Sequence, residues 1–221
     1  MMGRAASTVG RDCVRVANIA GQPDPAWTVL LIGGASGTGK TRLSYPLARQ
    51  LGVPIVEVDD IVEALMVMTT ADQQPALHHW ATHPEAARLP PEGILEIHLA
   101  VTESLGPALA AVVANHLETD TPVIIEGDYL TPAFAARERF REASADGRVG
   151  AVFLHEPDEM QLVANLSGRE PDGEQRARAR VSSLYGEWLA AEAARHGVPM
   201  IEARPWSNLQ QRVLGVVGRG A

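Results

Sequence analysis

Eight consecutive residues have the types and the spacing of a phosphate-binding loop. They are Gly34, Ala35, Ser36, Gly37, Thr38, Gly39, Lys40 and Thr41, which match G-x-x-x-x-G-K-[ST] at every fixed position. Glycines let the backbone fold around an anion and turn successive N–H groups toward phosphate oxygens. The Lys40 ammonium would reach the β- and γ-phosphates of ATP, and the Thr41 hydroxyl would bind Mg²⁺. The motif therefore predicts a nucleoside triphosphate site.

The loop lies where this chemistry requires it, between a strand and a helix. Thr28–Ile32 is a continuous apolar run, as expected of a strand buried on both faces. Thr41–Leu51 has the pattern of a helix, and Gly52 is its expected end. The positive N-terminal end of that helix would add to the attraction for phosphate.

The composition narrows the class of nucleotide-binding protein. Lys40 is the only lysine among 19 Lys and Arg residues, so the base-reading N-K-x-D motif of GTPases has no lysine left to use. A net charge of −8 argues against a nucleic-acid binder, which needs a basic face. Leu166–Arg169 has only part of the L-S-G-G-Q signature of transporter ATPases. A small kinase-like phosphotransferase remains.

Carboxylates follow two further predicted strands. Asp59 and Asp60 follow the strand expected over Pro54–Val58, and Glu126 and Asp128 follow the one expected over Pro122–Ile125. The ligand crevice of an open α/β sheet lies at these strand ends. One of the two sets would orient or deprotonate an acceptor hydroxyl. Asp59 from the first set and Glu126 from the second are the catalytic candidates. The other would position Mg²⁺, with Glu126 and Asp128 beside Thr41 as candidates.

Phosphoryl transfer also needs cations over the transferred group. We expect a lid over about residues 166–180, from which Arg169 and Arg176 contact phosphate. The alternative is a solvated, charged helix face. Arg204 either stacks near the adenine or pairs at the surface, and the sequence leaves that choice open.

The acceptor pocket is expected in the insertion over about residues 61–118. His79 and Trp80, with Asp59, Asp60 and Tyr129, are the candidate substrate contacts, since rings and hydrogen-bonding groups suit a polar organic molecule. His79 and His83 have the spacing of a helical metal pair, but no third ligand is apparent.

Five short apolar strands alternating with helices predict a three-layer α/β/α P-loop NTPase fold with a mainly parallel five-stranded sheet. Residues 1–26 are expected to be an extension with a peripheral strand at Cys13–Ile19, and residues 27–221 a single domain. Further helices are expected over Ile94–Leu117, where a break near Gly106 stays open, and over Pro132–Ala143, with Thr131 as its cap. A helix over Asp158–Leu166 and a loop over Ser167–Gly173 are expected to follow. The next helix would begin with a capping box of Asp172 and Gln175 and reach His196.

The environment and the partners are predicted from composition. No apolar run approaches the roughly 18–20 residues that span a bilayer, so we expect no membrane contact. A single cysteine, Cys13, favours the reducing cytoplasm. The expected partner is a small hydroxyl-bearing substrate rather than a nucleic acid, and a homodimer stays open.

A family resemblance rests on two segments. Leu31–Thr41 resembles the start of the 2-phosphoglycerate kinase group of P-loop kinases, and Ile124–Pro132 resembles that group's acidic I-E-G segment. The layout over residues 28–202 is also similar to chloramphenicol phosphotransferase, gluconate kinase, adenylate-kinase-like and shikimate-kinase-like enzymes. Asp128 and Tyr129 depart from the histidine-containing form of the segment, and residues 60–120 show no basic pocket for a phosphate ester.

The resemblance implies the fold, the use of ATP and a kinase activity, and it leaves the acceptor open. The leading hypothesis is an ATP-dependent phosphotransferase that acts on a small-molecule hydroxyl. The alternative is a regulatory or assembly ATPase that acts on a protein partner.

Overall fold

The computed structural model describes residues 25–170 and 175–217. Within them a sheet of five parallel strands has the order β2-β3-β1-β4-β5. The strands are β1 (Val29–Gly34), β2 (Ile55–Glu57), β3 (Val123–Glu126), β4 (Val149–His155) and β5 (Met200–Glu202). The helices are α1 (Lys40–Leu51), α2 (Val58–Met68), α3 (His79–Thr82), η1 (Pro84–Arg88), α4 (Pro91–Thr119), α5 (Pro132–Ala135), η2 (Glu138–Phe140), α6 (Arg141–Ala145), α7 (Glu159–Arg169), α8 (Gln175–His196), η3 (Trp206–Asn208) and α9 (Leu209–Val217).

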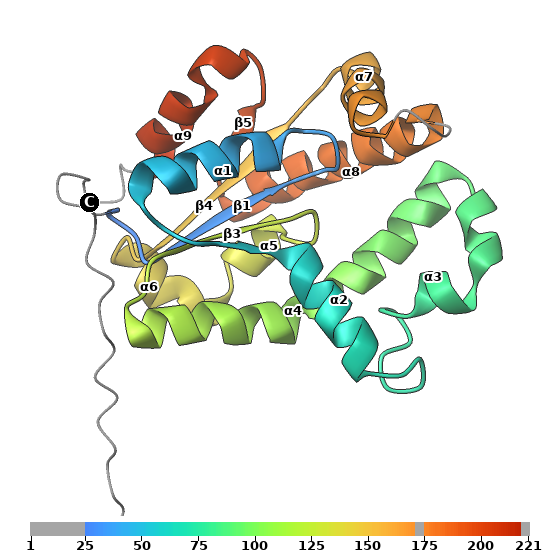
Figure 1. Ribbon diagram of the computed structural model, residues 1–221, viewed down its shortest axis with the longest axis horizontal. Helices are drawn as coiled ribbons and strands as arrows, with labels where there is room; N and C mark the ends of the chain where they lie inside the picture. The colour runs from blue at the N-terminus through green and yellow to red at the C-terminus, as the bar shows by residue number, and fades with distance from the viewer. Residues whose placement is uncertain (1–24, 171–174, 218–221) are drawn as a thin grey trace, which may run out of the picture.

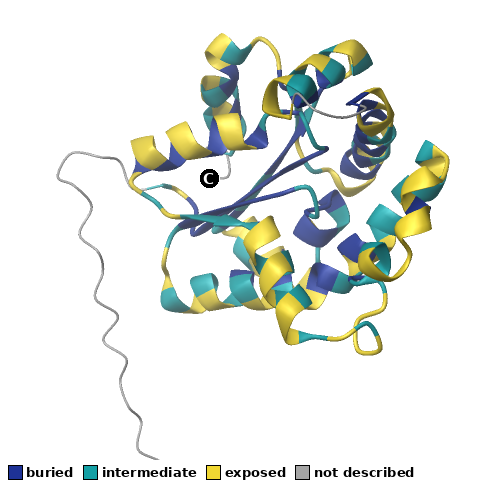
Figure 2. Cartoon of the chain, turned by 45° about the vertical axis from the view of Figure 1, so that its right-hand side comes forward, coloured by how far each residue is buried: buried dark blue, intermediate teal, exposed yellow. Residues whose placement is uncertain are grey.

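The sheet is covered on both faces, because alternate residues of its central strand enter different cores. Leu30 and Ile32 of β1 pack in the core shared with α1 and α9. Val29 and Leu31 point the other way, into the core shared with α4, α5 and α8. Figure 1 shows α1 and α9 on one side of the sheet and α4 on the other. In Figure 2 the buried residues gather in the strands and on the helix faces turned toward them. The predicted three-layer fold is confirmed.

The long helix α4 runs without a break, so the interruption left open near Gly106 does not occur. Pro107 lies inside the helix, where a proline typically costs about 3 kcal/mol. Burial of Val101, Leu105 and Leu109 against the core offsets that cost. By length and composition α4 could also cross a membrane, with a mean hydropathy of 1.5 over 18 residues, 39% of them buried. The expectation that no segment would pass this test was wrong.

Three predicted boundaries differ from the structure. Helix α2 begins at Val58 directly after the short strand β2, so its two aspartates lie in the first helical turn, where the helix dipole favours them. Helix α7 continues to Arg169 through part of the expected loop. The helix expected from Pro132 is divided into α5, η2 and α6. Its predicted cap is present, since the Thr131 hydroxyl accepts from Phe134 N at 3.1 Å.

Some expectations fall outside the described residues. They concern Cys13 with the peripheral strand around it, and Asp172 of the predicted capping box. The middle of the segment expected to form a lid, residues 171–174, falls outside them as well.

Candidate nucleotide and acceptor site

The predicted phosphate loop connects the end of β1 to the start of α1. Gly34 and Gly39 have φ angles of 143° and 86°, a region of backbone conformation that side chains disfavour. A Cβ on Gly39 would lie 2.0 Å from the Trp206 ring, so only glycine fits under that indole. The Thr38 hydroxyl donates to Ala35 O at 2.8 Å and closes the loop on itself. These contacts hold the loop in its folded conformation.

Lys40 is buried at the centre of the site, with 7% of its surface exposed. Its ammonium donates to Ala35 O at 3.2 Å and forms an ion pair with Asp128. Asp128 lies two residues after the end of β3, and β3 is a strand that pairs with β1. The parallel order of the sheet therefore brings the loop lysine and a predicted strand-end carboxylate into direct contact.

Thr41 and Glu126 form a second link between the loop and β3. The Thr41 hydroxyl donates to Glu126 Oε1 at 3.0 Å, and the Glu126 side chain is buried. Burial raises the pKa of Glu126, while the nearby Lys40 ammonium and the Thr41 hydrogen bond lower it in part. A hydroxyl and a carboxylate in contact supply the hard oxygen ligands that suit Mg²⁺.

Asp59 reaches the same group from the start of α2. A Cβ on Gly127 would lie 2.5 Å from Val58 Cβ, so glycine lets the first turn of α2 approach the loop after β3. Asp59 is exposed to solvent on one side, yet partial burial raises its pKa, and the negative charge of Asp128 adds to this rise. Lys40 lies close enough to oppose it.

Aromatic rings support the loop that carries Asp128. The Tyr185 hydroxyl, from α8, donates to Asp128 O at 2.7 Å. His98, from α4, stacks on Tyr129 with ring centroids 4.9 Å apart and meets the edge of Tyr185 at 4.5 Å. Burial lowers the pKa of His98 and raises that of Tyr129 to about 12, so both rings are neutral at pH 7.

Two neighbouring cavities lie beside the loop. The smaller, of about 230 Å³, is lined by Gly37, Gly39, Lys40, Thr41, Arg42, Asn165, Arg169 and Trp206. The Asn165 amide, from α7, donates to Gly37 O at 2.8 Å and ties that helix to the loop. The larger, of about 500 Å³, is lined by Glu156, Pro157, Glu202, Arg204, Pro205 and Trp206. Trp206 borders both cavities, and the Arg42 guanidinium lies 4.7 Å from its ring centroid.

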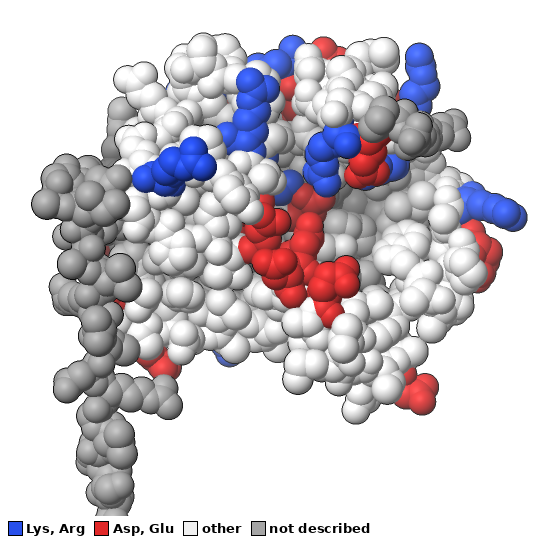
Figure 3. All heavy atoms as spheres, viewed as in Figure 1, with Lys and Arg blue, Asp and Glu red and all other residues white. Residues whose placement is uncertain are grey.

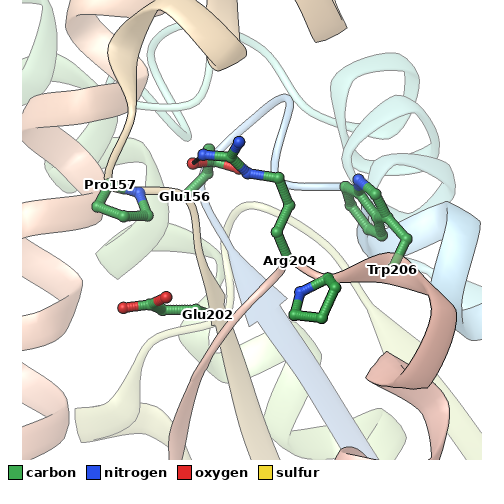
Figure 4. Close-up of a pocket in the computed structure, with 6 residues that line it drawn as sticks. Glu156, Pro157, Glu202, Arg204 and Trp206 are labelled. Atoms are coloured by element: carbon green, nitrogen blue, oxygen red, sulfur yellow. Dashed lines mark hydrogen bonds and ion pairs between the residues drawn. The ribbon is translucent and has the colours of Figure 1, made fainter.

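Arg204 pairs with a carboxylate at one edge of the larger cavity. Two guanidinium nitrogens donate to the two oxygens of Glu156, each at 2.8 Å, and Asp158 lies 3.5 Å away. Figure 4 shows this guanidinium facing Glu156, with Trp206 on the other side of the Arg204 side chain. Of the two roles considered for Arg204, the pairing is therefore present, and the arginine also lines a cavity.

The structure brings some predicted site residues together and leaves others apart. Lys40, Thr41, Glu126 and Asp128 are linked by direct contacts, with Asp59 beside them. Arg169 lines the smaller cavity, whereas Arg176 is exposed on the first turn of α8. The rings of Trp80 and His83 contact His79, within the α3 segment that Figure 1 shows beyond α2, away from α1. Asp60 is exposed next to Asp59.

Carboxylates at this edge of the sheet were also missed by reasoning from the sequence, among them Glu57 and Glu156. Glu57 ends β2 opposite Glu126 in the strand register, and Glu156 directly follows β4. Both obey the strand-end rule that identified Glu126, so applying it to every strand would have found them. The packing of Trp206 on Gly39 has no signal in the sequence, because it joins residues far apart in the chain.

Comparison with known proteins gives two kinds of relative. A 2-phosphoglycerate kinase from Methanothermobacter thermautotrophicus is 24% identical over 188 residues, covering 79% of this chain and 60% of the relative. One from Methanocaldococcus jannaschii is 23% identical over 197 residues, covering 86% and 62%. The predicted resemblance to this group is confirmed, and the chain spans about three fifths of the length of these relatives.

A solved structure supports the fold. A gluconokinase from Sinorhizobium meliloti 1021 superposes with a TM-score of 0.51 at 19% identity, covering 89% of this chain and 94% of that one. The family model described as AAA domain, AAA_33, matches residues 29–189, from the first residue of β1 into α8. Because the match takes in the phosphate loop and four of the five strands, the chain belongs to the AAA_33 family of AAA domains.

Proposed function

We propose that the protein is an ATP-dependent phosphotransferase that moves the γ-phosphate of ATP to a hydroxyl group of a small molecule. The observation that carries the proposal is the contact group of Lys40, Thr41, Glu126 and Asp128, with Asp59 beside it. It brings together, at one edge of a parallel sheet, the phosphate loop, a hydroxyl–carboxylate pair that would hold Mg²⁺, and the Asp59 carboxylate. That edge is where open α/β sheets bind ligands.

ATP would lie across the two cavities that meet at Trp206. Its phosphates would take the smaller cavity, on the amides of residues 34–41 and the N-terminal end of α1. The base would take the larger one, between Arg204 and Trp206. Stacking on such groups fits the flat face of an adenine. The Glu156 carboxylate keeps the Arg204 guanidinium in place.

Mg²⁺ would be held by Thr41, with Glu126 close enough to bind the ion or one of its waters. These two side chains already touch, and Mg²⁺ completes its shell with waters and substrate phosphates rather than with many protein ligands. When held by Thr41 and Glu126, the ion would supply positive charge beside the transferred phosphoryl group. Asp128, also a candidate from the sequence, lies instead on the Lys40 ammonium.

The acceptor would approach from the side of α2 and α4. Asp59 would take the hydroxyl proton as the new bond between acceptor oxygen and γ-phosphorus forms. At the same time the bond between that phosphorus and the β–γ bridging oxygen would break, and ADP would leave. Its raised pKa suits a general base, which works best with a pKa nearer the working pH. Lys40 and Arg169 would cover the transferred group.

Turnover of ATP by the full chain tests this proposal. With Mg²⁺ present, pooled hydroxyl-bearing metabolites should stimulate ADP release, and protein fractions should not. Lys40→Ala should lose that stimulation, by about a hundredfold or more if the lysine acts like other groups that stabilise the transferred charge. Stimulation by protein fractions alone would favour the regulatory ATPase instead. A Lys40→Ala variant with full activity would contradict both.

A further inference from the structure

Helix α7 extends from the cavity proposed for the base of ATP to the cavity proposed for its phosphates. Asp158 caps its first turn by accepting from Met160 N at 3.0 Å, and the same carboxylate lies 3.5 Å from Arg204, which lines the larger cavity. At the other end of the helix, Arg169 lines the smaller cavity. In Figure 3 basic side chains lie mostly in the upper part of the face shown, where Figure 1 shows α1, α7 and α9. The helix therefore touches both halves of the proposed nucleotide site.

A chain of side-chain hydrogen bonds runs along this helix from one cavity to the other. Arg204 Nη1 donates to Gln161 Oε1 at 3.5 Å, the longest of the three links. Gln161 Nε2 donates to Asn165 Oδ1 at 2.8 Å, and Asn165 Nδ2 donates to Gly37 O, in the phosphate loop, at 2.8 Å. A guanidinium can only donate and a carbonyl oxygen can only accept, so the two ends fix the orientation of both amides between them.

At the phosphate loop the chain of hydrogen bonds holds one peptide unit. The C=O of Gly37 and the N–H of Thr38 belong to the same trans peptide, so they point in opposite directions. Gly37 O is turned out toward Asn165. The Thr38 N–H consequently turns into the loop, where it donates to Ala35 O at 3.3 Å. Asn165 therefore sets the direction of a loop N–H of the kind that binds phosphate.

The middle of α7 is held by the loop and by α8. Its buried Leu162 and Leu166 form a small cluster with Ala179 of α8, and among the described residues this cluster is separate from the two large cores. A Cβ on Gly37 would lie 3.3 Å from Leu166 Cγ, so the loop packs directly against the cluster. A restraint on α7 at the base cavity is therefore passed to the phosphate loop.

Resting on the proposed kinase function and its placement of ATP, we propose that Gln161 and Asn165 are positioning residues that couple the base cavity to the phosphate loop. A base stacked on Arg204 restrains the guanidinium and the amides bonded to it, and so favours the loop conformation that binds phosphate. By linkage, phosphate on the loop favours the base to the same extent. The coupling gives a nucleoside triphosphate an advantage over inorganic polyphosphates, which have no base.

Two fragments of the nucleotide, adenosine and pyrophosphate, measure this coupling without an acceptor. Together they lack one phosphate of ATP, which leaves room for both in the site. Calorimetry with Mg²⁺ and the full chain gives the Kd of pyrophosphate without adenosine and with saturating adenosine, and the ratio of the two values is the coupling factor. We expect a factor of about five in the wild type, at the lower end of typical couplings.

Variants show whether the hydrogen bonds carry the coupling. Gln161→Met keeps the length of the side chain and removes its two hydrogen bonds, and it should lower the coupling factor to about one. Asn165→Ala, which removes the donor to Gly37 O, should do the same. A loss of affinity for either fragment alone cancels in the ratio. The matched controls are Gln211→Met on α9 and Asn115→Ala on α4, both at exposed positions, which should keep the wild-type factor.

An unchanged factor in Gln161→Met would contradict the inference, because direct contact between the two fragments persists in that variant and the hydrogen-bond chain does not. A wild-type factor of one would contradict it too, as would failure of either fragment to bind the wild type at millimolar concentration. The kinase proposal fails separately, if the wild-type chain transfers phosphate from ATP to no hydroxyl compound in a broad metabolite pool. The coupling would survive that result, since no acceptor takes part in its measurement.

Discussion

Glu126 is a buried carboxylate that the site keeps near two other acids. Its raised pKa means that the folded chain holds this proton more tightly than the unfolded chain does. The free energy of unfolding therefore decreases as the pH rises from 4.5, the ordinary pKa of a glutamate, through the raised pKa of Glu126. Above that window the cost of the buried charge is fully present.

The variant Glu126→Gln removes this charge and keeps an oxygen that can accept from Thr41. We expect it to be more stable than the wild type at neutral pH, with the difference shrinking to zero as the pH falls below the window. Urea unfolding at a series of pH values measures this. A stability difference that does not change with pH would show that the charge of Glu126 is not responsible. Mg²⁺-dependent turnover should fall in the same variant, since a metal-binding carboxylate is lost.

The sequence predicted which residues would form the site better than it predicted which of them contact one another. Lys40, Thr41, Glu126 and Asp59 were found by motif and by position after strands. The pairing of Lys40 with Asp128 depends on how β1 and β3 lie side by side in the sheet, and the support of Asp128 by Tyr185 depends on how α8 packs beside them. No pattern along the chain encodes a contact between residues 57 positions apart.

At the scale of the elements, the phosphate loop packs tightly against η3 and leaves no space for a side chain at Gly39. Gly39→Ala should displace Trp206, because the new Cβ would lie 2.0 Å from its ring and φ is 86°. We expect loss of MgATP binding by calorimetry and a lower melting temperature. Gly215→Ala, in α9, is the matched control: a Cβ there meets nothing within 4 Å, and alanine favours a helix by up to about 1 kcal/mol. A Gly39→Ala variant that binds ATP normally would contradict the assigned loop geometry.

The cap of α5 supports the loop that carries Asp128. Thr131→Ala removes the oxygen that accepts from Phe134 N, and a lost cap of this kind typically lowers the free energy of unfolding by about 1 kcal/mol. Chemical denaturation measures the change. Ser144→Ala, at an exposed position of α6, should leave the stability nearly unchanged. Equal effects of the two substitutions would mean that the cap contributes nothing.

Element types followed from the sequence more reliably than element ends. All five strands predicted for the sheet are present. The central strands β1 and β3 are apolar runs buried on both faces, a pattern that leaves few alternatives. Helix α4 continues through Pro107, since packing on the core outweighs the local cost of the proline. The split of α5 from α6 has no comparable signal, because it depends on the turn at η2, where Phe140 enters the core.

For the whole molecule, the account predicts a gain in stability on binding MgATP. A ligand at a hundred times its Kd stabilises the folded state by about 2.7 kcal/mol. For a chain of this size that corresponds to a rise of roughly 5–11 °C in melting temperature. Differential scanning fluorimetry should show it for the wild type and not for Lys40→Ala. A similar rise with ATP in Lys40→Ala would mean that the nucleotide binds away from the phosphate loop.

The fate of the γ-phosphate tests the central proposal most directly. Wild-type protein is incubated with Mg²⁺, ATP labelled at the γ-phosphate and a pool of hydroxyl-bearing metabolites, and the label is followed by chromatography. The account predicts a labelled small-molecule phosphate ester that is absent with Lys40→Ala. Label that appears only as inorganic phosphate, at the same rate with and without the pool, would contradict it.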